Sequence, residues 1–309
     1  MKLVEISSPD FDLEKTLNSG QVFHWQKVGD GFVGAIGDLP VHVKQRGRTL
    51  RVEMEGGAPA TPGSRRADNP CSQELAAPWV KIVARYFALD HPLEEICASF
   101  PRDPVMDAAR DFCRGLRIIR QPQWECLATF ICSSMKQVAH IRQISRALRQ
   151  RFGQRKQICG GEVFSFPSPN ALARATEREL RKCGLGYRAK NLLATAKHVA
   201  SGEADLDSWR ALSERQLREH LCELPGVGMK VANCVMLFAY ERTAAFPVDV
   251  WIERVLRESY FIRGRKATSK AMAEFVANYF GAHGGYAQQY LFHHTRMTGK
   301  RKSRTRSID

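Results

Sequence analysis

The sequence lacks the features that mark membrane and secreted proteins. No stretch approaches the roughly eighteen consecutive apolar residues that a membrane-spanning helix needs. The opening residues, MKLVEISSPDFDLEKTL, carry acidic side chains where a secretory signal peptide has its apolar segment. We therefore expect a protein without a membrane partner that stays inside the cell.

Closely paired cysteines are also missing. Nine cysteines are scattered along the chain, and no two of them form a C-x-x-C pair. An iron-sulfur cluster of the ferredoxin type needs four closely spaced thiolates, and the sequence offers no such group. We expect reduced and mostly buried thiols, no iron-sulfur cluster and no required cofactor.

Acidic residues are absent from residues 126–161, although that segment carries seven lysines and arginines. The whole chain of 309 residues has a formal net charge of +15, and residues 296–309 form a second basic region. A basic surface can serve solubility alone, but two separate basic regions favour a polyanionic partner. Nucleic acid is the first candidate for that partner, and an acidic membrane surface is the second.

Short β-rich segments dominate the first hundred residues. GQVFHWQKV, GFVGAI, LPVHVKQ and TLRVEME each have the composition of a strand, and turn residues separate them. This pattern predicts an antiparallel β-sheet in an N-terminal domain at residues 1–103.

Helical spacing of apolar residues takes over after residue 103. Residues 122–150 read as one long helical segment, and Thr176 and Ser213 each begin a capping-box pattern. The expected fold class is therefore α+β, with the sheet-containing domain followed by a mostly helical body at residues 104–295. Residues 296–309 form a basic tail.

The segment LCELPGVGMKVANCVMLFAY, residues 221–240, places a lysine at the start of an almost unbroken apolar helix. Gly226 and Gly228 let the backbone turn tightly before that helix and bring N–H groups close to an outside ligand. At a helix N-terminus such a ligand is favourably a phosphate. The segment thus predicts a helix, a glycine hairpin and a second helix that begins beside Lys230.

This hairpin, the lysine and the later motif FPVDV together resemble the helix-hairpin-helix DNA glycosylase superfamily. Further segments resemble the 8-oxoguanine DNA glycosylases within it, and they run nearly the length of the chain: SGQVFHW, GLRIIRQPQWECLATFICSS, GLGYRAK and YAQQYLF. The resemblance implies an enzyme that flips 8-oxoguanine out of duplex DNA, removes the base and nicks the strand by β-elimination.

The resemblance assigns the chemistry to two residues. Lys230 would be the nucleophile that attacks the sugar C1′ and forms a Schiff base. Asp249 is expected to cap the helix that follows it, and its carboxylate would face the positive charge that develops at C1′.

A base pocket also follows from the resemblance. The carbonyl of Gly20 would accept the N7 hydrogen that 8-oxoguanine has and guanine lacks. Cys234 would pair with the lysine beneath the base, Gln288 would bind the Watson-Crick edge and Phe292 would stack on the other face. Pro247 is the remaining residue assigned to this pocket.

Outside the base pocket, the residues expected to contact DNA differ from those of the family at several positions. Relatives read the orphaned cytosine with asparagine and arginine where this chain has Met135 and His140, and a histidine of the family is Trp251 here. The residues assigned to DNA binding are Met135, His140, Tyr187, Arg188, Gly226, Gly228 and Trp251. We therefore expect the preference for cytosine opposite the lesion to be weaker than in relatives that use two arginines.

The resemblance also implies a cation site at the hairpin, and two alternative functions stay open. The backbone carbonyls of Cys222, Leu224 and Val227 would hold a structural cation that bridges the hairpin to a phosphate. The protein could instead be a glycosylase for another purine lesion, or a non-catalytic helix-hairpin-helix protein in which Lys230 only contacts phosphate. In each case we expect a monomer located with the DNA, in the nucleoid of a prokaryote or the nucleus of a eukaryote.

Overall fold

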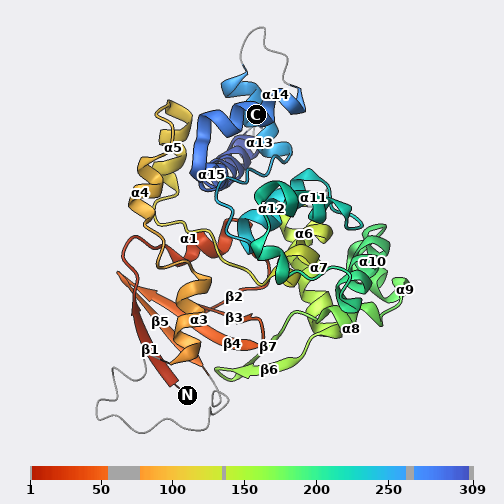
Figure 1. Ribbon diagram of the computed structural model, residues 1–309. Helices are drawn as coiled ribbons and strands as arrows, with labels where there is room; N and C mark the ends of the chain where they lie inside the picture. The colour runs from red at the N-terminus through yellow and green to blue at the C-terminus, as the bar shows by residue number, and fades with distance from the viewer. Residues whose placement is uncertain (1, 55–76, 134–136, 262–267, 306–309) are drawn as a thin grey trace.

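The computed structural model describes residues 2–54, 77–133, 137–261 and 268–305, with side chains up to Gly299. In this part of the chain, no helix combines the length and the apolar character needed to cross a membrane. A β-sheet and a helical body lie side by side in the molecule (Figure 1).

The N-terminal sheet is antiparallel throughout, as the sequence predicts. Its strand order is β1-β5-β4-β3-β2. Alternate residues of β5 are buried, and the helix α3 contributes Val80 and Val83 to the same core. The strands and the helix are β1 (Lys2–Ser7), β2 (Gln26–Val28), β3 (Gly31–Ile36), β4 (Leu39–Arg46), β5 (Thr49–Met54) and α3 (Pro78–Tyr86).

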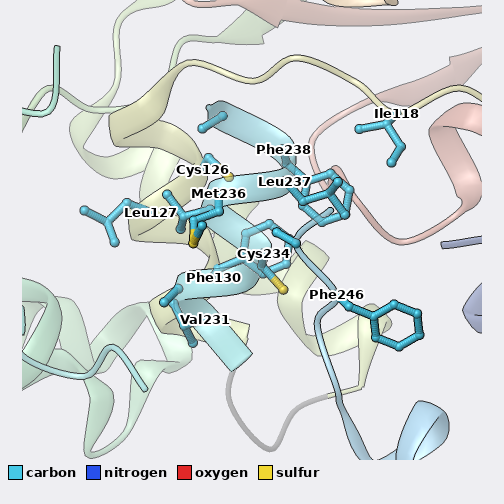
Figure 2. Close-up of a cluster of buried hydrophobic side chains, with 14 of the residues drawn as sticks. Ile118, Cys126, Leu127, Phe130, Val231, Cys234, Met236, Leu237, Phe238 and Phe246 are labelled. Atoms are coloured by element: carbon cyan, nitrogen blue, oxygen red, sulfur yellow. The ribbon is translucent and has the colours of Figure 1, made fainter. Parts of the chain in front are cut away.

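The helical body surrounds the apolar helix α12 (Figure 1). Cys126, Leu127 and Phe130 of α6 lie beside α12 in one continuous core (Figure 2). The helices are α1 (Leu13–Asn18), α4 (Leu93–Ala98), α5 (Pro104–Phe112), α6 (Gln123–Ser133), α7 (Val138–Phe152), α8 (Pro169–Ala173), α9 (Glu177–Leu180), α10 (Arg188–Ser201), α11 (Glu214–Glu223), α12 (Met229–Ala239), α13 (Val250–Val255), α14 (Ser269–Phe280) and α15 (Gly284–Thr305). Short helical turns lie at Arg181–Leu185, Ser208–Ala211, Leu256–Tyr260 and Gly281–His283.

Both predicted capping boxes are confirmed, but the single helix over residues 122–150 is wrong. Thr176 and Ser213 each bond to a backbone N–H three residues later. The helix α6 ends at Ser133, and Gln137 before α7 is extended. The hydroxyl of Ser133 donates to the carbonyl of Phe130 at 2.7 Å, which is a local bond of the kind by which serine competes with helix continuation.

Two features of the helical body differ from the sequence expectation. The last helix, α15, runs through the expected boundary at residue 295, so residues 296–305 continue a helix instead of starting a separate tail. A two-stranded hairpin, β6 (Arg155–Ile158) and β7 (Gly161–Phe164), begins in the acid-free segment 126–161 and extends beyond its end. Ile158 and Val163 of this hairpin pack against Val33 and Ala35 of the N-terminal sheet, which joins the two parts of the protein.

One of the arginines in the acid-free segment is not available to DNA. Arg149 is buried, forms an ion pair with Glu125 and donates a hydrogen bond to the carbonyl of Phe164 at 2.9 Å. The buried charge is thus neutralised inside the protein, as buried charges generally must be.

The close approach of α15 to α12 requires glycine at position 285. A Cβ atom added to Gly285 would lie 2.3 Å from Cδ1 of Leu237 and 2.6 Å from the carbonyl oxygen of Ala245. We predict that Gly285→Ala lowers the free energy of unfolding by about 2 kcal/mol or more, because the helix must move to admit the methyl group. Urea denaturation measures this loss.

The matched control is Gly161→Ala, where the nearest neighbour of an added Cβ is the carbonyl oxygen of Ile158 at 3.6 Å. This variant should unfold at nearly the same urea concentration as the unaltered protein. Equal stability of the two variants would contradict the packing argument.

Candidate active site

The hairpin between α11 and α12 has the predicted form. Gly226 has a left-handed φ of +83°, and an added Cβ would lie 2.7 Å from Cβ of Asn191 on α10. The hydroxyl of Thr195 donates to the carbonyl of Pro225 at 2.9 Å and fixes the turn against the same helix. An added Cβ at Gly228 has no atom within 4 Å, so the backbone before α12 faces open space. A phosphate can approach this helix N-terminus without steric conflict.

Lys230 is held inward at the start of α12. Its Nζ donates to Oγ of Ser133 at 3.2 Å and lies 5.2 Å from the centre of the Phe130 ring. That ring in turn stacks on Phe238 with the ring centres 5.4 Å apart. The lysine therefore contacts residues of α6. Figure 2 shows Phe130 of α6 beside the apolar side chains of α12.

Cys234 lies one turn after Lys230 and interacts with it. Burial raises the pKa of the Cys234 thiol to about 11, although Lys230 acts in the opposite direction through its charge and a side-chain hydrogen bond. Burial therefore favours the neutral thiol, while the neighbouring Lys230 favours the thiolate.

Asp249 has the helix-capping role that the sequence predicts. Its Oδ1 accepts hydrogen bonds from the N–H groups of Trp251 at 3.1 Å and Ile252 at 2.9 Å. Burial raises the pKa of the Asp249 carboxyl above its ordinary value, while the two N–H groups and Lys230 oppose this rise. A partly desolvated carboxyl thus lies within electrostatic range of Lys230.

One stripe of α15 carries the expected base-binding residues. Gln288 and Phe292 are four residues apart and lie on one face of the helix. Oε1 of Gln288 is buried and has no hydrogen-bond partner among the described residues. A buried acceptor without a partner costs free energy, so this atom marks a place where a ligand donor would be favourable.

Gly20 reaches the same stripe from the other end of the chain. It has a left-handed φ of +91°, and an added Cβ would lie 3.0 Å from Cε1 of Phe292. The structure therefore brings Gly20 and Phe292 together, which the predicted base pocket requires. Pro247, between α12 and Asp249, is buried.

Arg296 lies beside Gly20 and Phe292, and sequence reasoning missed it. Its guanidinium lies 5.4 Å from the centre of the Phe292 ring, and it donates a hydrogen bond to the carbonyl of Asn18. Burial and the neighbouring Arg142 lower the pKa of Arg296 to about 10. The available signal was its spacing of four residues from Phe292, which continues the stripe that begins at Gln288.

The residues expected to contact the rest of the DNA lie on other elements. Tyr187 is 64% exposed just before α10, and the buried Arg188 lies with its guanidinium 4.3 Å from the Tyr187 ring. His140 is exposed on α7, and Trp251 lies in the first turn of α13 with Arg254 over its ring. Met135 lies outside the described residues.

The carbonyls proposed for a cation lie around the hairpin. The carbonyl of Leu224 accepts the N–H of Val227 at 3.1 Å, and Cys222 is in the last turn of α11. A carbonyl oxygen with one accepted hydrogen bond retains a second lone pair, which can bind a cation.

Comparison with known proteins agrees with this geometry. Residues 3–127 match the family model of the 8-oxoguanine DNA glycosylase N-terminal domain, and residues 128–278 match that of the HhH-GPD superfamily base excision DNA repair proteins. The two matches meet inside α6.

Several individual proteins are similar over almost the whole chain. The "Probable N-glycosylase/DNA lyase" of Methanothermobacter thermautotrophicus is 30% identical, covering 94% of this chain and 95% of that protein. N-glycosylase/DNA lyase OGG1 of Arabidopsis thaliana is also 30% identical, over 94% of this chain and 78% of the relative. The Clostridium acetobutylicum 8-oxoguanine glycosylase/lyase, solved with duplex DNA containing cytosine opposite 8-oxoguanine, gives a TM-score of 0.82. It is 27% identical, with 96% and 98% of the two chains covered.

The fold and the lysine-bearing hairpin are those of the base-excision DNA glycosylases with a helix-hairpin-helix motif. Within this class the chain belongs to the 8-oxoguanine DNA glycosylase family. The alternative of a non-catalytic helix-hairpin-helix protein is therefore wrong.

The two roles of Asp249 can be separated by substitution. Asparagine caps helices as well as aspartate does, but it carries no charge. Because the folded-state pKa of Asp249 is raised, ionisation of this carboxyl destabilises the fold as pH rises through that value. We predict that Asp249→Asn is at least as stable as the unaltered protein at neutral pH, and that any advantage shrinks as pH falls toward 3.8, the ordinary value for this group.

The control is Asp249→Ala, which removes the cap as well and should lose about 1 kcal/mol of unfolding free energy. Thermal and urea unfolding over a pH series measure both variants. An Asn variant as unstable as the Ala variant would show that the charge itself holds α13 in place.

Proposed function

We propose that Lys230 removes 8-oxoguanine from duplex DNA as a nucleophile and then cuts the strand through a covalent intermediate. The protein is a bifunctional 8-oxoguanine DNA glycosylase and abasic-site lyase. The observation that carries the assignment of the nucleophile is the position of the amine. It donates a hydrogen bond to Ser133, interacts with the Cys234 thiol and lies within electrostatic range of Asp249.

The reaction follows from the placement of these groups. The neutral amine of Lys230 attacks C1′, and the electron pair of the glycosidic bond leaves with the base. Opening of the sugar ring gives a Schiff base between Lys230 and C1′. Loss of a proton from C2′ then expels the 3′ phosphate and breaks the strand. The carboxylate of Asp249 stabilises the positive charge at C1′ during base departure.

The pocket explains the choice of base. The carbonyl of Gly20 accepts a hydrogen bond from N7–H of 8-oxoguanine. In guanine, N7 carries a lone pair and no hydrogen, so the carbonyl would face a second acceptor and form no hydrogen bond. Gln288 supplies its partnerless Oε1 to a donor on the Watson-Crick edge. Phe292 covers one face of the base, and Cys234 and Pro247 lie toward the other. Another purine lesion remains the second candidate substrate, because these residues contact only some of the atoms that distinguish one damaged purine from another.

Duplex DNA is held by groups outside the pocket. The N–H groups around Gly228 bind a phosphate, and the carbonyls of Cys222, Leu224 and Val227 hold a cation against the same phosphate. Tyr187 enters the space that the flipped nucleotide leaves, and Arg188 contacts the opposite cytosine. The protein requires no other cofactor, acts as a monomer and is located with the DNA, in the nucleoid or nucleus.

The nucleophile is tested by trapping. We predict that borohydride links the protein covalently to a duplex that contains 8-oxoguanine, because it reduces the Schiff base to a stable amine. Lys230→Gln should abolish the adduct while retaining duplex binding, whereas Lys197→Gln on the exposed side of α10 should trap normally. Gel electrophoresis measures the adduct. Trapping by the Lys230 variant would show that another amine is the nucleophile.

Recognition can be separated from chemistry with a second substrate. We predict that Gln288→Ala and Phe292→Ala slow 8-oxoguanine excision by about fivefold or more, since each removes a contact worth about 1 kcal/mol or more. Cleavage at a preformed abasic site should change far less, because that substrate has no base to hold. Single-turnover rates on both duplexes provide the test. An equal loss on both would indicate a general defect of the fold.

The opposite base is expected to matter less than in relatives. Arg188 is the remaining arginine assigned to the cytosine, and a good arginine contact discriminates bases by about 1 to 3 kcal/mol. We predict a preference for cytosine that is about tenfold weaker than in an enzyme with two such arginines. Excision rates for 8-oxoguanine opposite each of the four bases measure it. A preference as strong as that of a two-arginine enzyme would assign the second contact to His140 or a neighbour.

A further inference from the structure

Three side chains of metal-binding type converge where the β6–β7 hairpin meets the N-terminal sheet. His42 on β4 and Glu53 on β5 are cross-strand partners, and Cys159 lies at the tip of the β6–β7 hairpin. Nδ1 of His42 is 2.9 Å from Oε2 of Glu53 and 3.5 Å from Sγ of Cys159, and Sγ is 3.4 Å from Oε2. Imidazole, carboxylate and thiol atoms thus form a small triangle between the β6–β7 hairpin and the sheet, with His42 buried and Cys159 exposed.

The dimensions of this triangle match a tetrahedral zinc site. Zinc binds these three ligand types at about 2.0 to 2.3 Å, so the ligand atoms in such a site lie about 3.3 to 3.6 Å apart. Both distances to Sγ fall in this range. The distance from His42 to Glu53 is a hydrogen bond, and it needs to lengthen by only about half an ångström to admit the ion.

A catalytic relay of cysteine, histidine and carboxylate does not fit the same geometry. Such a relay uses one imidazole nitrogen for each partner, but here Nδ1 of His42 faces both Cys159 and Glu53. Nε2 of His42 is buried with no hydrogen-bond partner among the described residues, and an added Cβ on Gly31 would lie 2.7 Å from it. A metal ion, in contrast, can use all three ligand atoms at once.

The turn that carries the thiol is specialised. Cys159 and Gly160 both have left-handed φ values, +49° and +71°, in the two-residue connection of the hairpin. Asparagine, aspartate and glycine are the residues that suit this turn, so the turn alone gives no reason for a cysteine. Ile158 and Val163 pack on the N-terminal sheet and fix the turn beside His42.

We infer that His42, Glu53 and Cys159 bind a zinc-class divalent cation that links the hairpin of the helical body to the N-terminal sheet. Sulfur and imidazole ligands select Zn²⁺, with Co²⁺ and Cd²⁺ as spectroscopic substitutes, over Mg²⁺ and Ca²⁺. On binding, the Cys159 thiol releases its proton to solvent. The proton that joins Nδ1 of His42 to Glu53 also leaves Nδ1, and the neutral imidazole then carries its proton on Nε2. Water completes the coordination. This site is structural. It is separate from the cation proposed at the carbonyls of the glycine hairpin between α11 and α12.

Titration of the metal-free full-length protein with Cd²⁺ tests this inference. We expect an ultraviolet thiolate-to-cadmium band that saturates at about one equivalent and is displaced by Zn²⁺. Cys159→Ser should abolish this band, while Cys97→Ser, at a half-buried cysteine on α4, should leave it unchanged. Glu53→Gln keeps a hydrogen-bonding side chain and should weaken binding by about tenfold.

Thermal unfolding supplies a second readout in the same proteins. Zn²⁺ should raise the melting temperature of the unaltered protein and of Cys97→Ser, and it should do so much less for Cys159→Ser, because an ion that binds only the folded state stabilises it. A Cd²⁺ band of equal size in Cys159→Ser, or no band in the unaltered protein, would overturn the proposed site. Base excision is not needed for either measurement, so failure of the enzymatic assignment would leave this test intact.

Discussion

The hydrogen bond from Lys230 to Ser133 sets the geometry on which the active site depends. It holds an amine at the start of a helix whose remaining residues form the core of the helical body. The accepting hydroxyl belongs to Ser133, which is buried at the last position of α6. The end of α6 and the amine at the start of α12 are therefore joined by one hydrogen bond.

Several groups in the site lower the stability of the folded protein, and the surrounding apolar core must offset that loss. Asp249 has a raised pKa, and Oε1 of Gln288 and Nε of Arg296 are buried without hydrogen-bond partners among the described residues. Such groups destabilise a folded protein. They lie beside a continuous apolar core that includes Phe130, Phe238 and Leu237. A damaged base that enters the pocket would form hydrogen bonds with some of these polar atoms. The hydrogen bonds that the folded protein lacks would then contribute to the free energy of binding.

Sequence reasoning recovered the features that local spacing encodes. The glycine hairpin, the Asp249 cap, the capping boxes and the antiparallel sheet follow from residues a few positions apart, and all are present. The features it missed depend on contacts between distant segments. The β6–β7 hairpin owes its place to Val33 and Ala35 of the sheet, more than a hundred residues earlier. Arg296 was assigned to a tail because of its charge, but Gly20 and Phe292 surround it in the folded protein.

The central claim is that one pocket, built by the start of α12 and the stripe on α15, receives the extruded base beside Lys230. A crystal structure of the Lys230→Gln variant with a duplex containing 8-oxoguanine tests this most directly, because the variant can bind the lesion without removing it. The account predicts the base between Phe292 and Cys234, with its N7 hydrogen directed at the carbonyl of Gly20 and its Watson-Crick edge at Gln288. A base that remains stacked in the duplex, or that occupies a different cavity, would contradict the account.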